Sequence, residues 1–358
     1  MNLADLWFVI VAVFWTGFFV LEGFDFGVGA LHSVVGRSET ERRVAINTVG
    51  PFWDGNEVWL VVGGAAIFAA FPAWYATWFS AAYLAVLLLL VALIVRGLSF
   101  EWRGKGRGEQ WRWSWSLCLT LGSIVAPLVL GIALGDLLAG LPINGDGEFT
   151  GSFWDLLTGF GVWTGLTVLV LCLFHGSTFL TLRTTGVVRL RAQRFGRVLG
   201  IVALVAVLAF AVWMVVIAQP GVVSYVLLAL AAIGTLTAFV GLLRHRDGLA
   251  FGASTIAIAA TVGSLFASLF PDVLVSSTSS ENTLTVAGSA SGDYALTVMT
   301  IVAAVCFPLV LLYQGYTYVV FRRRIAGSEE ASPTTSAEAS STTSESASST
   351  NERPPSSR

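Results

Sequence analysis

Pro51-Phe-Trp-Asp-Gly-Asn-Glu-Val-Trp59 is too polar for an ordinary membrane helix, yet the helix that follows needs it. The apolar run from Val58 to Phe71 has only 14 residues, about 21 Å of helix, whereas the bilayer core is about 30 Å thick. The helix therefore takes its first turns from the polar stretch. This places Asp54 and Glu57 at or inside the membrane boundary, where ionisable side chains are costly and usually functional.

The composition is that of a membrane protein with several spans. Of the 358 residues, 55% are hydrophobic and 12% are charged, and the mean hydropathy is +0.78. Soluble domains carry about 25% charged residues, so a soluble globular domain is excluded. Three cysteines lie singly in apolar runs, and we expect burial rather than a redox or metal role for them: Cys118, Cys172 and Cys306.

Apolar runs separated by charged or Gly/Pro-bearing breaks predict an all-α polytopic bundle of nine transmembrane helices. The sixth and seventh are divided at Gln219-Pro220-Gly221, because proline removes an N–H donor and glycine permits a positive φ. The predicted spans lie near residues 6–31, 51–71, 76–96, 115–139, 154–182, 198–217, 222–243, 250–270 and 293–321.

The basic residues give this bundle an orientation. With nine spans, all 20 Lys and Arg residues fall on one side of the membrane, which the positive-inside rule makes cytoplasmic. The N-terminus is therefore expected outside and the C-terminus in the cytoplasm. We expect a transmembrane domain over residues 1–325 and a disordered cytoplasmic tail over 326–358, because the tail is rich in Ser, Thr and Glu and has no large apolar residue.

The first predicted span carries a polar break of its own, Leu21-Glu-Gly-Phe-Asp-Phe-Gly-Val-Gly29. Glu22 and Asp25 are three residues apart and so share a helix face. The glycines of this stretch either let another backbone approach or let the helix unwind.

The directions of the first three spans bring charged side chains into one layer in the cytoplasmic half of the membrane: Glu22, Asp25, Asp54, Glu57 and Arg96. A chain of carboxylates beside an arginine in a low-dielectric setting can pass protons near neutral pH. A structural alternative stays open, in which Arg96 and one carboxylate form a satisfied ion pair while Glu22 or Glu57 only reaches toward the membrane surface.

The other polar candidates carry weaker signals. Asp136 comes late in the fourth span and is expected at the outer interface, while His32 and His175 lie near cytoplasmic span ends. A haem needs an axial ligand, commonly His, in a pocket, and isolated histidines do not indicate one. The indole N–H of Trp53 lies one turn from Glu57, where it can donate to a carboxylate or contact a quinone ring.

Several motifs resemble one known family. Gly23-Phe-Asp-Phe-Gly-Val-Gly29, Glu41-Arg-Arg43, the Pro51–Trp59 stretch and Arg96 at the end of the third span resemble subunit II of cytochrome bd-type quinol oxidases. The resemblance extends over about residues 1 to 321 and leaves out the serine-rich tail.

This resemblance implies a multi-pass subunit of the bacterial inner membrane, in an enzyme that oxidises quinol at the outer face and reduces oxygen to water. Its partner is then a haem-bearing subunit I, which holds haems b and d, and subunit II binds no haem or metal itself. Subunit II then supplies scaffold and part of the path for protons from the cytoplasm. Some members hold a structural quinone, and lipid, the quinone pool and small accessory subunits are further implied partners. No nucleic acid is implied.

The resemblance also assigns residues to that proton path. Trp53, Asp54, Arg96 and Asp25 match the family's motifs, and Glu22 and Glu57 lie in the same predicted layer. Glu57 stands where we expect an amide in some relatives, so it is either an additional protonatable site or a residue that tunes Asp54.

Two competing hypotheses remain. Broken helices with carboxylates inside the membrane are how secondary transporters bind substrate, so a stand-alone proton-coupled transporter is the main rival. The absence of a visible internal repeat and the polar groups gathered toward one face speak against it. A purely structural scaffold subunit is the third reading, in which the carboxylates matter for assembly or not at all.

Overall fold

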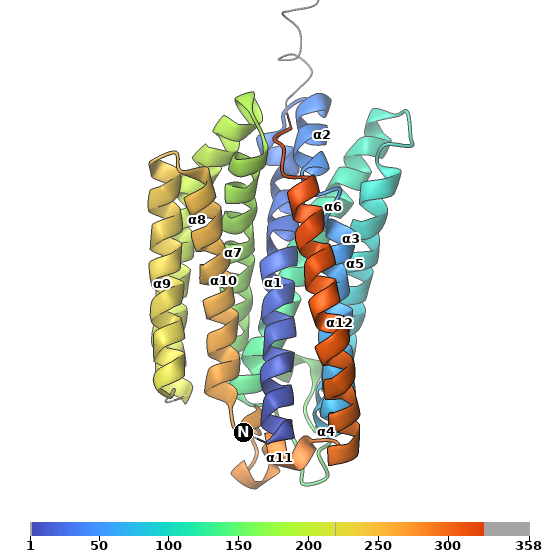
Figure 1. The fold of residues 1–358 in the computed structure, drawn as a ribbon, viewed down its shortest axis with the longest axis vertical. Coiled ribbons are helices and arrows are strands. Elements are labelled where there is room, and N and C mark those ends of the chain that lie inside the picture. The colour runs from blue at the N-terminus through green and yellow to red at the C-terminus, as the bar shows by residue number, and fades with distance from the viewer. Residues whose placement is uncertain (1, 219, 326–358) are drawn as a thin grey trace, which may run out of the picture.

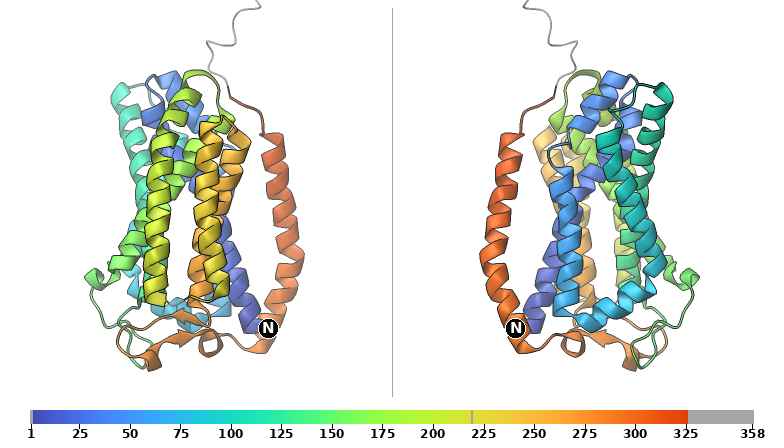
Figure 2. Two further views of the ribbon diagram at one scale, coloured as in Figure 1. Left: turned by 90° about the vertical axis from the view of Figure 1, so that its left-hand side faces the viewer. Right: turned by 90° about the vertical axis from the view of Figure 1, so that its right-hand side faces the viewer.

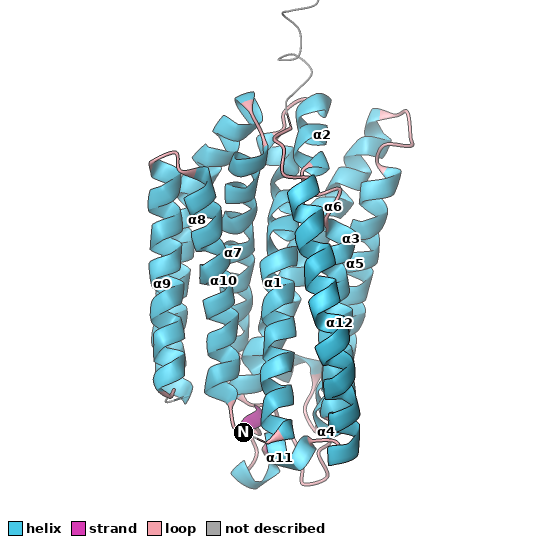
Figure 3. Cartoon of the chain, viewed as in Figure 1, coloured by secondary structure: helices cyan, strands magenta, loops and turns pink. Residues whose placement is uncertain are grey.

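The computed structural model describes residues 2–218 and 220–325, and the predicted tail 326–358 lies outside these residues. The described chain is a bundle of long, roughly parallel helices (Figure 1), which confirms the predicted all-α class. Figure 3 shows that strand structure is confined to the end of the bundle where the N-terminus lies.

The described elements follow one another with short connections. In chain order they are α1 (Leu3–Val35), α2 (Glu39–Asn47), α3 (Trp53–Ala70), α4 (Pro72–Ala81), α5 (Tyr83–Trp102), α6 (Glu109–Ala139), η1 (Phe153–Leu156), α7 (Gly159–Arg183), α8 (Gly186–Ala218), α9 (Val222–Leu243), α10 (Asp247–Leu269), β1 (Asp272–Leu274), η2 (Ser280–Asn282), β2 (Leu284–Thr285), α11 (Val286–Ser289) and α12 (Asp293–Val320). The two strands pair antiparallel, with Asp272 opposite Thr285.

Eight helices of the described chain are long and apolar enough to cross a membrane: α1, α5, α6, α7, α8, α9, α10 and α12. Helix α3 has 18 residues and runs beside α1, but its first turns carry Asp54, Asn56 and Glu57, which lower its hydropathy. It does begin inside the polar stretch, at Trp53, as the short apolar run after it requires.

Two span boundaries differ from the sequence prediction. The predicted third span near 76–96 is instead two helices, since α4 ends at Ala81 and α5 runs from Tyr83 to Trp102. Arg96 therefore lies inside α5 and not at the end of a span. The predicted fifth span near 154–182 begins only at Gly159, because Thr158 caps α7 through a hydrogen bond from the Gly161 N–H, and η1 forms a separate turn before it.

Helix α1 is the central element, since it contacts α3, α6, α7, α10 and α12. It is continuous through its glycines, so of the two alternatives for that stretch the close approach holds and the unwinding does not. A Cβ on Gly176 of α7 would lie 2.5 Å from the Cα of Gly27, which means that the two backbones touch there. This contact fixes the depth of Glu22 and Asp25 relative to α7.

One end of the bundle carries α2 and the turns α5–α6, α7–α8 and α9–α10, and we call it the basic end (Figure 1). Ion pairs tie these segments together: Arg103 of the α5–α6 turn with Glu39, Arg191 with Glu41, and Arg189 and Arg324 with Asp247. Described basic residues other than Arg96 gather at this end, opposite the N-terminus.

Helix α2 is held on the basic end by Glu41. The carboxylate of Glu41 accepts from the backbone N–H groups of Arg37 and Ser38 and from the Arg191 guanidinium at 2.6 Å. Burial alone would raise the pKa of Glu41, but these hydrogen bonds outweigh it and lower the pKa below its usual value. The short helix that connects α1 to α3 is therefore tied to α8 through Arg191.

Helix α12 stands at the edge of the bundle and exposes most of its surface (Figure 2). Its apolar residues face outward, so the expected burial of Cys306 is wrong for this chain alone: Cys306 is exposed, Cys118 is half-buried and only Cys172 is buried.

Candidate functional site

The buried charges of three helices meet in one place toward the basic end. Nη2 of Arg96 on α5 lies 2.6 Å from Oε1 of Glu22 on α1, and its Nη1 lies 3.4 Å from Oε2 of Glu57 on α3. The side chains of Arg96 and Glu22 are fully buried, whereas that of Glu57 is 25% exposed. We call Glu22, Asp25, Glu57 and Arg96 the acid cluster.

Aromatic rings hold Arg96 in position. Its guanidinium carbon lies 4.8 Å from the ring centre of Phe26 and 5.3 Å from that of Phe100, both within reach of a cation–π attraction. The planar group is thus sandwiched in an apolar wall and pointed at Glu22. Phe100 in turn stacks on Trp53, with ring centres 4.9 Å apart.

Asp25 is held by an amide that the sequence reasoning passed over. The fully buried Asn56 donates from Nδ2 to Oδ2 of Asp25 at 2.7 Å and to the carbonyl oxygen of Leu21 at 3.1 Å. Its Oδ1 accepts from Gln314 at 2.7 Å and from the Tyr318 hydroxyl at 3.2 Å. Asn56 lies within the Pro51–Trp59 stretch, one residue before Glu57, and this position was the only feature of the sequence that could have pointed to its role.

The roles of Gln314 and Tyr318 could not be predicted from the sequence. They are four residues apart on α12, which puts them on one face of that helix, but nothing in their local sequence points to α3. The structure brings them to Asn56 across 258 and 262 residues of chain.

The structure separates Asp54 and Trp53 from the buried core of the cluster. Asp54 lies one turn before Glu57 on α3, and its side chain is exposed on the surface of this chain. Trp53 is half-buried, and its ring stacks on Phe100 rather than reaching a carboxylate of the described residues. Of the five charged residues predicted to form one layer, Glu22, Asp25 and Arg96 are buried, Glu57 is partly exposed beside them, and Asp54 lies outside the group.

The cluster holds more acid than base. One guanidinium faces three carboxyl groups, and uncompensated charge inside a membrane is costly. The arrangement comes closest to neutrality when protons are bound to its surplus carboxyls. It can therefore take up and release protons while Arg96 keeps the group together.

Asp136 is a buried acid of another kind, near the opposite end of the bundle. It accepts a hydrogen bond from Thr158 at 2.5 Å and lies against the start of α7, where a Cβ on Gly161 would collide with its Oδ1. Backbone N–H groups at a helix N-terminus favour negative charge. The Asp136 carboxylate thus links the end of α6 to the start of α7 through Thr158.

The two helix-borne histidines have both ring nitrogens engaged. His175 bonds to Ser254 at 2.7 Å and to the carbonyl of Val20 at 3.3 Å, and His32 bonds to the carbonyl of Gly29 and to Ser33. Both are fully buried. Neither side chain offers a free nitrogen for a haem iron, and within residues 2–218 and 220–325 no group of three or more His, Cys, Asp or Glu residues could hold a metal ion.

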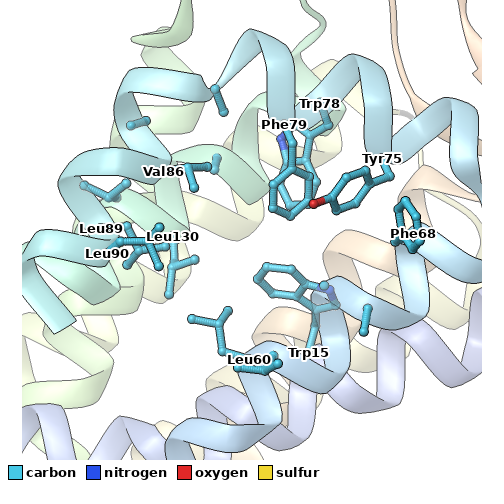
Figure 4. Close-up of a pocket in the computed structure, with 17 residues that line it drawn as sticks. Trp15, Leu60, Phe68, Tyr75, Trp78, Phe79, Val86, Leu89, Leu90 and Leu130 are labelled. Carbon is cyan, nitrogen blue, oxygen red and sulfur yellow. The ribbon is translucent and has the colours of Figure 1, made fainter. Parts of the chain in front are cut away.

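An apolar pocket of about 470 Å³ lies between α1, α3, α4, α5 and α6 (Figure 4), and no residue of the acid cluster lines it. Figure 4 shows the rings of Trp15, Tyr75, Trp78 and Phe79 around it. The volume falls in the range of small-molecule sites. Trp53 does not line this pocket.

Comparisons with known proteins agree on one family. The sequence profile described as cytochrome bd terminal oxidase subunit II matches residues 3–321. Cytochrome bd ubiquinol oxidase subunit 2 of Bacillus subtilis is 44% identical over 332 residues, 92% of this chain and 98% of the relative. Cytochrome bd-I ubiquinol oxidase subunit 2 of Escherichia coli K12 is 35% identical over 350 residues, 87% of this chain and 92% of the relative.

The fold has a solved counterpart as well. A chain in the structure of bd oxidase from Geobacillus thermodenitrificans superposes with a TM-score of 0.68 at 18% identity, covering 90% of this chain and 98% of that one. This likeness concerns the fold alone. From the match over residues 3–321 and the identity to the two relatives, the chain belongs to the family of cytochrome bd terminal oxidase subunit II.

Proposed function

We propose that this chain is the haem-free subunit II of a quinol:oxygen oxidoreductase in a bacterial inner membrane, where it supports the haem-bearing subunit I. Haems b and d then lie in the partner and supply the oxygen chemistry there. The engaged nitrogens of His32 and His175 support this division of labour.

We propose further that α3 is the ninth membrane span, with the N-terminus outside and the basic end in the cytoplasm. Helix α3 lies beside α1 and its 18 residues give about 27 Å of helix, close to the bilayer core. The gathering of basic residues at one end supports this orientation by the positive-inside rule.

The acid cluster is then part of the route by which protons from the cytoplasm reach the partner subunit. Asp54, exposed on α3 one turn closer to the basic end, is the entrance side, and the partly exposed Glu57 is an additional protonatable group, not an obligatory step, between it and the buried Glu22 and Asp25. Phe26 and Phe100 keep Arg96 in place, and Trp53 supports this arrangement by stacking on Phe100.

One observation carries this proposal over the satisfied ion pair: Asp25 is buried beside Glu22 and Glu57 but does not pair with Arg96 itself. A single Arg–Glu pair would satisfy a structural role at that depth. A second fully buried acid, hydrogen-bonded to an amide, has a use when protons bind and leave.

The test is Asp25→Asn in the assembled complex. Oxygen consumption with quinol should fall about tenfold or more, equivalent to about 1.4 kcal/mol on the barrier, while the haem spectra stay intact. Glu101→Gln is the matched control, because it removes an exposed carboxylate near the same end. Full activity of the Asp25 variant would refute the proton path, and loss of the haems in it would favour a scaffold role.

The apolar pocket is our candidate for a structural quinone, in place of Trp53. Its aromatic rings and its volume suit a quinone ring with part of its tail. Leu130→Trp narrows the pocket from α6, and quinone extracted from the purified complex should then drop relative to haem. Unchanged quinone content would remove this assignment.

Family membership speaks against a stand-alone transporter. The decisive observation is purification: the oxidase function requires a haem-bearing partner to co-purify with this chain. A colourless, single-chain preparation that moves protons with a solute would restore the transporter hypothesis.

A further inference from the structure

Asn56 is the junction between the acid cluster and α12. Both ends of its amide are engaged, since Nδ2 donates to Asp25 and Leu21 while Oδ1 accepts from Gln314 and Tyr318. The orientation of an asparagine amide is assigned from its partners. For Asn56, the four hydrogen-bond partners determine the orientation of the amide.

The backbone carbonyl of Leu21 can only accept, so the atom that faces it at 3.1 Å has to be the nitrogen of Asn56. The same nitrogen then faces Asp25, whose Oδ2 serves as the acceptor. The oxygen of Asn56 therefore faces α12, and both Gln314 and Tyr318 act as donors toward it.

The ring of Tyr318 is itself held in place. It stacks on Phe52 with ring centres 4.6 Å apart and 12° between the planes. Phe52 immediately precedes α3, so the hydroxyl of Tyr318 is aimed at Asn56 by the same segment that positions Asn56. Gln314, one turn away on α12, reaches the same oxygen.

We propose that Gln314 and Tyr318 are positioning residues for Asp25: they clamp the Asn56 amide so that it only donates to this carboxyl group. Turning the Asn56 amide over would bring its oxygen against the Leu21 carbonyl, and it would also require Gln314 and Tyr318 to accept where they now donate. Asp25 is thereby kept as an acceptor, in the form that is ready to receive a proton. This inference rests on the proposed proton path.

Charged and hydrogen-bonding groups from four helices act near Asp25: Glu22 on α1, Glu57 and Asn56 on α3, Arg96 on α5 and Tyr318 on α12. The clamp changes only one of these neighbours. Its effect can therefore be separated from that of the charged groups by Gln314→Leu and Tyr318→Phe, which neither remove nor add an ionised side chain, whereas Gln314→Glu adds a carboxyl group.

The experiment compares Gln314→Leu, Gln314→Glu and Tyr318→Phe in the purified complex, with Tyr316→Phe as the matched control on the exposed side of α12. Infrared spectra identify the carboxyl band of Asp25 by its loss in Asp25→Asn. We expect this band to shift in the three clamp variants and oxygen consumption to fall several-fold. Gln314→Glu should have the largest effect, because it keeps the shape but turns a donor into an acceptor facing Oδ1. The control should match the wild type.

An Asp25 band that stays unchanged while the rate falls would overturn the inference, since α12 would then act through packing alone. Unchanged rates and bands would overturn it as well. Failure of the proton path itself looks different: Asp25→Asn would keep full activity, while the band shift would still report on the clamp.

Discussion

Two buried carboxylate sites lie toward opposite ends of this bundle, and they are built differently. Asp136 has one hydroxyl donor and the start of a helix beside it, which together suit a single fixed carboxylate. The acid cluster gathers three carboxyl groups around one arginine. The two sites therefore share burial but differ in the balance of acid and base, and only the acid cluster has the surplus of carboxyl groups that our proposed proton path needs.

Arg96→Gln should have the largest effect of the substitutions that test this comparison, because it removes the only cation of the acid cluster. Breaking a buried ion pair by removing one partner costs about 3–5 kcal/mol, and here three acids lose their counter-charge. We expect little assembled complex, measured as haem per unit of membrane protein. Arg96→Lys keeps the charge and should recover part of the yield, and a normal yield of Arg96→Gln would show that the acids are neutral without it.

Asp54→Asn tests whether the exposed acid belongs to the same route as the buried ones. Its side chain has no bonded partner among the described residues, so the substitution should leave assembly and haem spectra intact. Oxygen consumption should fall about tenfold, as for a step of about 1.4 kcal/mol. Wild-type rates would place the entrance elsewhere.

Glu57→Gln tests how much the third carboxyl group of the acid cluster contributes to the rate of oxygen consumption. Glu57 lies 3.4 Å from Arg96 and is partly exposed, while Glu22 keeps its closer contact at 2.6 Å. We expect intact assembly and a smaller loss of rate than in Asp54→Asn, measured under the same conditions. A loss as large as that of Asp25→Asn would instead make Glu57 an obligatory step.

Asp136→Asn should have the smallest effect. An asparagine oxygen can still accept from Thr158, so the loss is that of one charge-assisted hydrogen bond, about 1 kcal/mol. Thermal stability of the complex should drop slightly and oxygen consumption should stay at the wild-type rate. Asp146→Asn, in the exposed loop after α6, is the control. A strong loss of rate would mean that the two sites share a function.

Run lengths and charge were enough to predict the all-α class, the polar start of α3 and the side on which basic residues gather. These features depend on the length of each apolar run, compared with the membrane thickness, and on the local charge, and both can be read from the sequence. The same reasoning brought Glu22, Asp25, Glu57 and Arg96 to one depth.

The facing direction of each side chain could not be predicted in this way. Depth in the membrane does not tell which side of α3 is exposed, so run lengths put Asp54 and Glu57 in the same layer, and only the family resemblance set Asp54 ahead of Glu57. Asn56 acquires its role from Gln314 and Tyr318, which approach from the far end of the chain. The break at Ala82 and the strands β1 and β2 lack a periodic pattern, since the strands have only three and two residues.

The sparse attachment of α12 has a consequence for the order of events during synthesis. Among the described residues α12 is the last long helix to be synthesised, and it meets α3 and α1 through Asn56 and through Trp7, which donates to Leu296 and Thr300. Until α12 docks, Oδ1 of Asn56 lacks both of its donors, and only Leu21 and Asp25 hold the amide through its nitrogen. The hydrogen bonds around Asp25, and with them the proton path that we propose, are therefore complete only after α12 has docked.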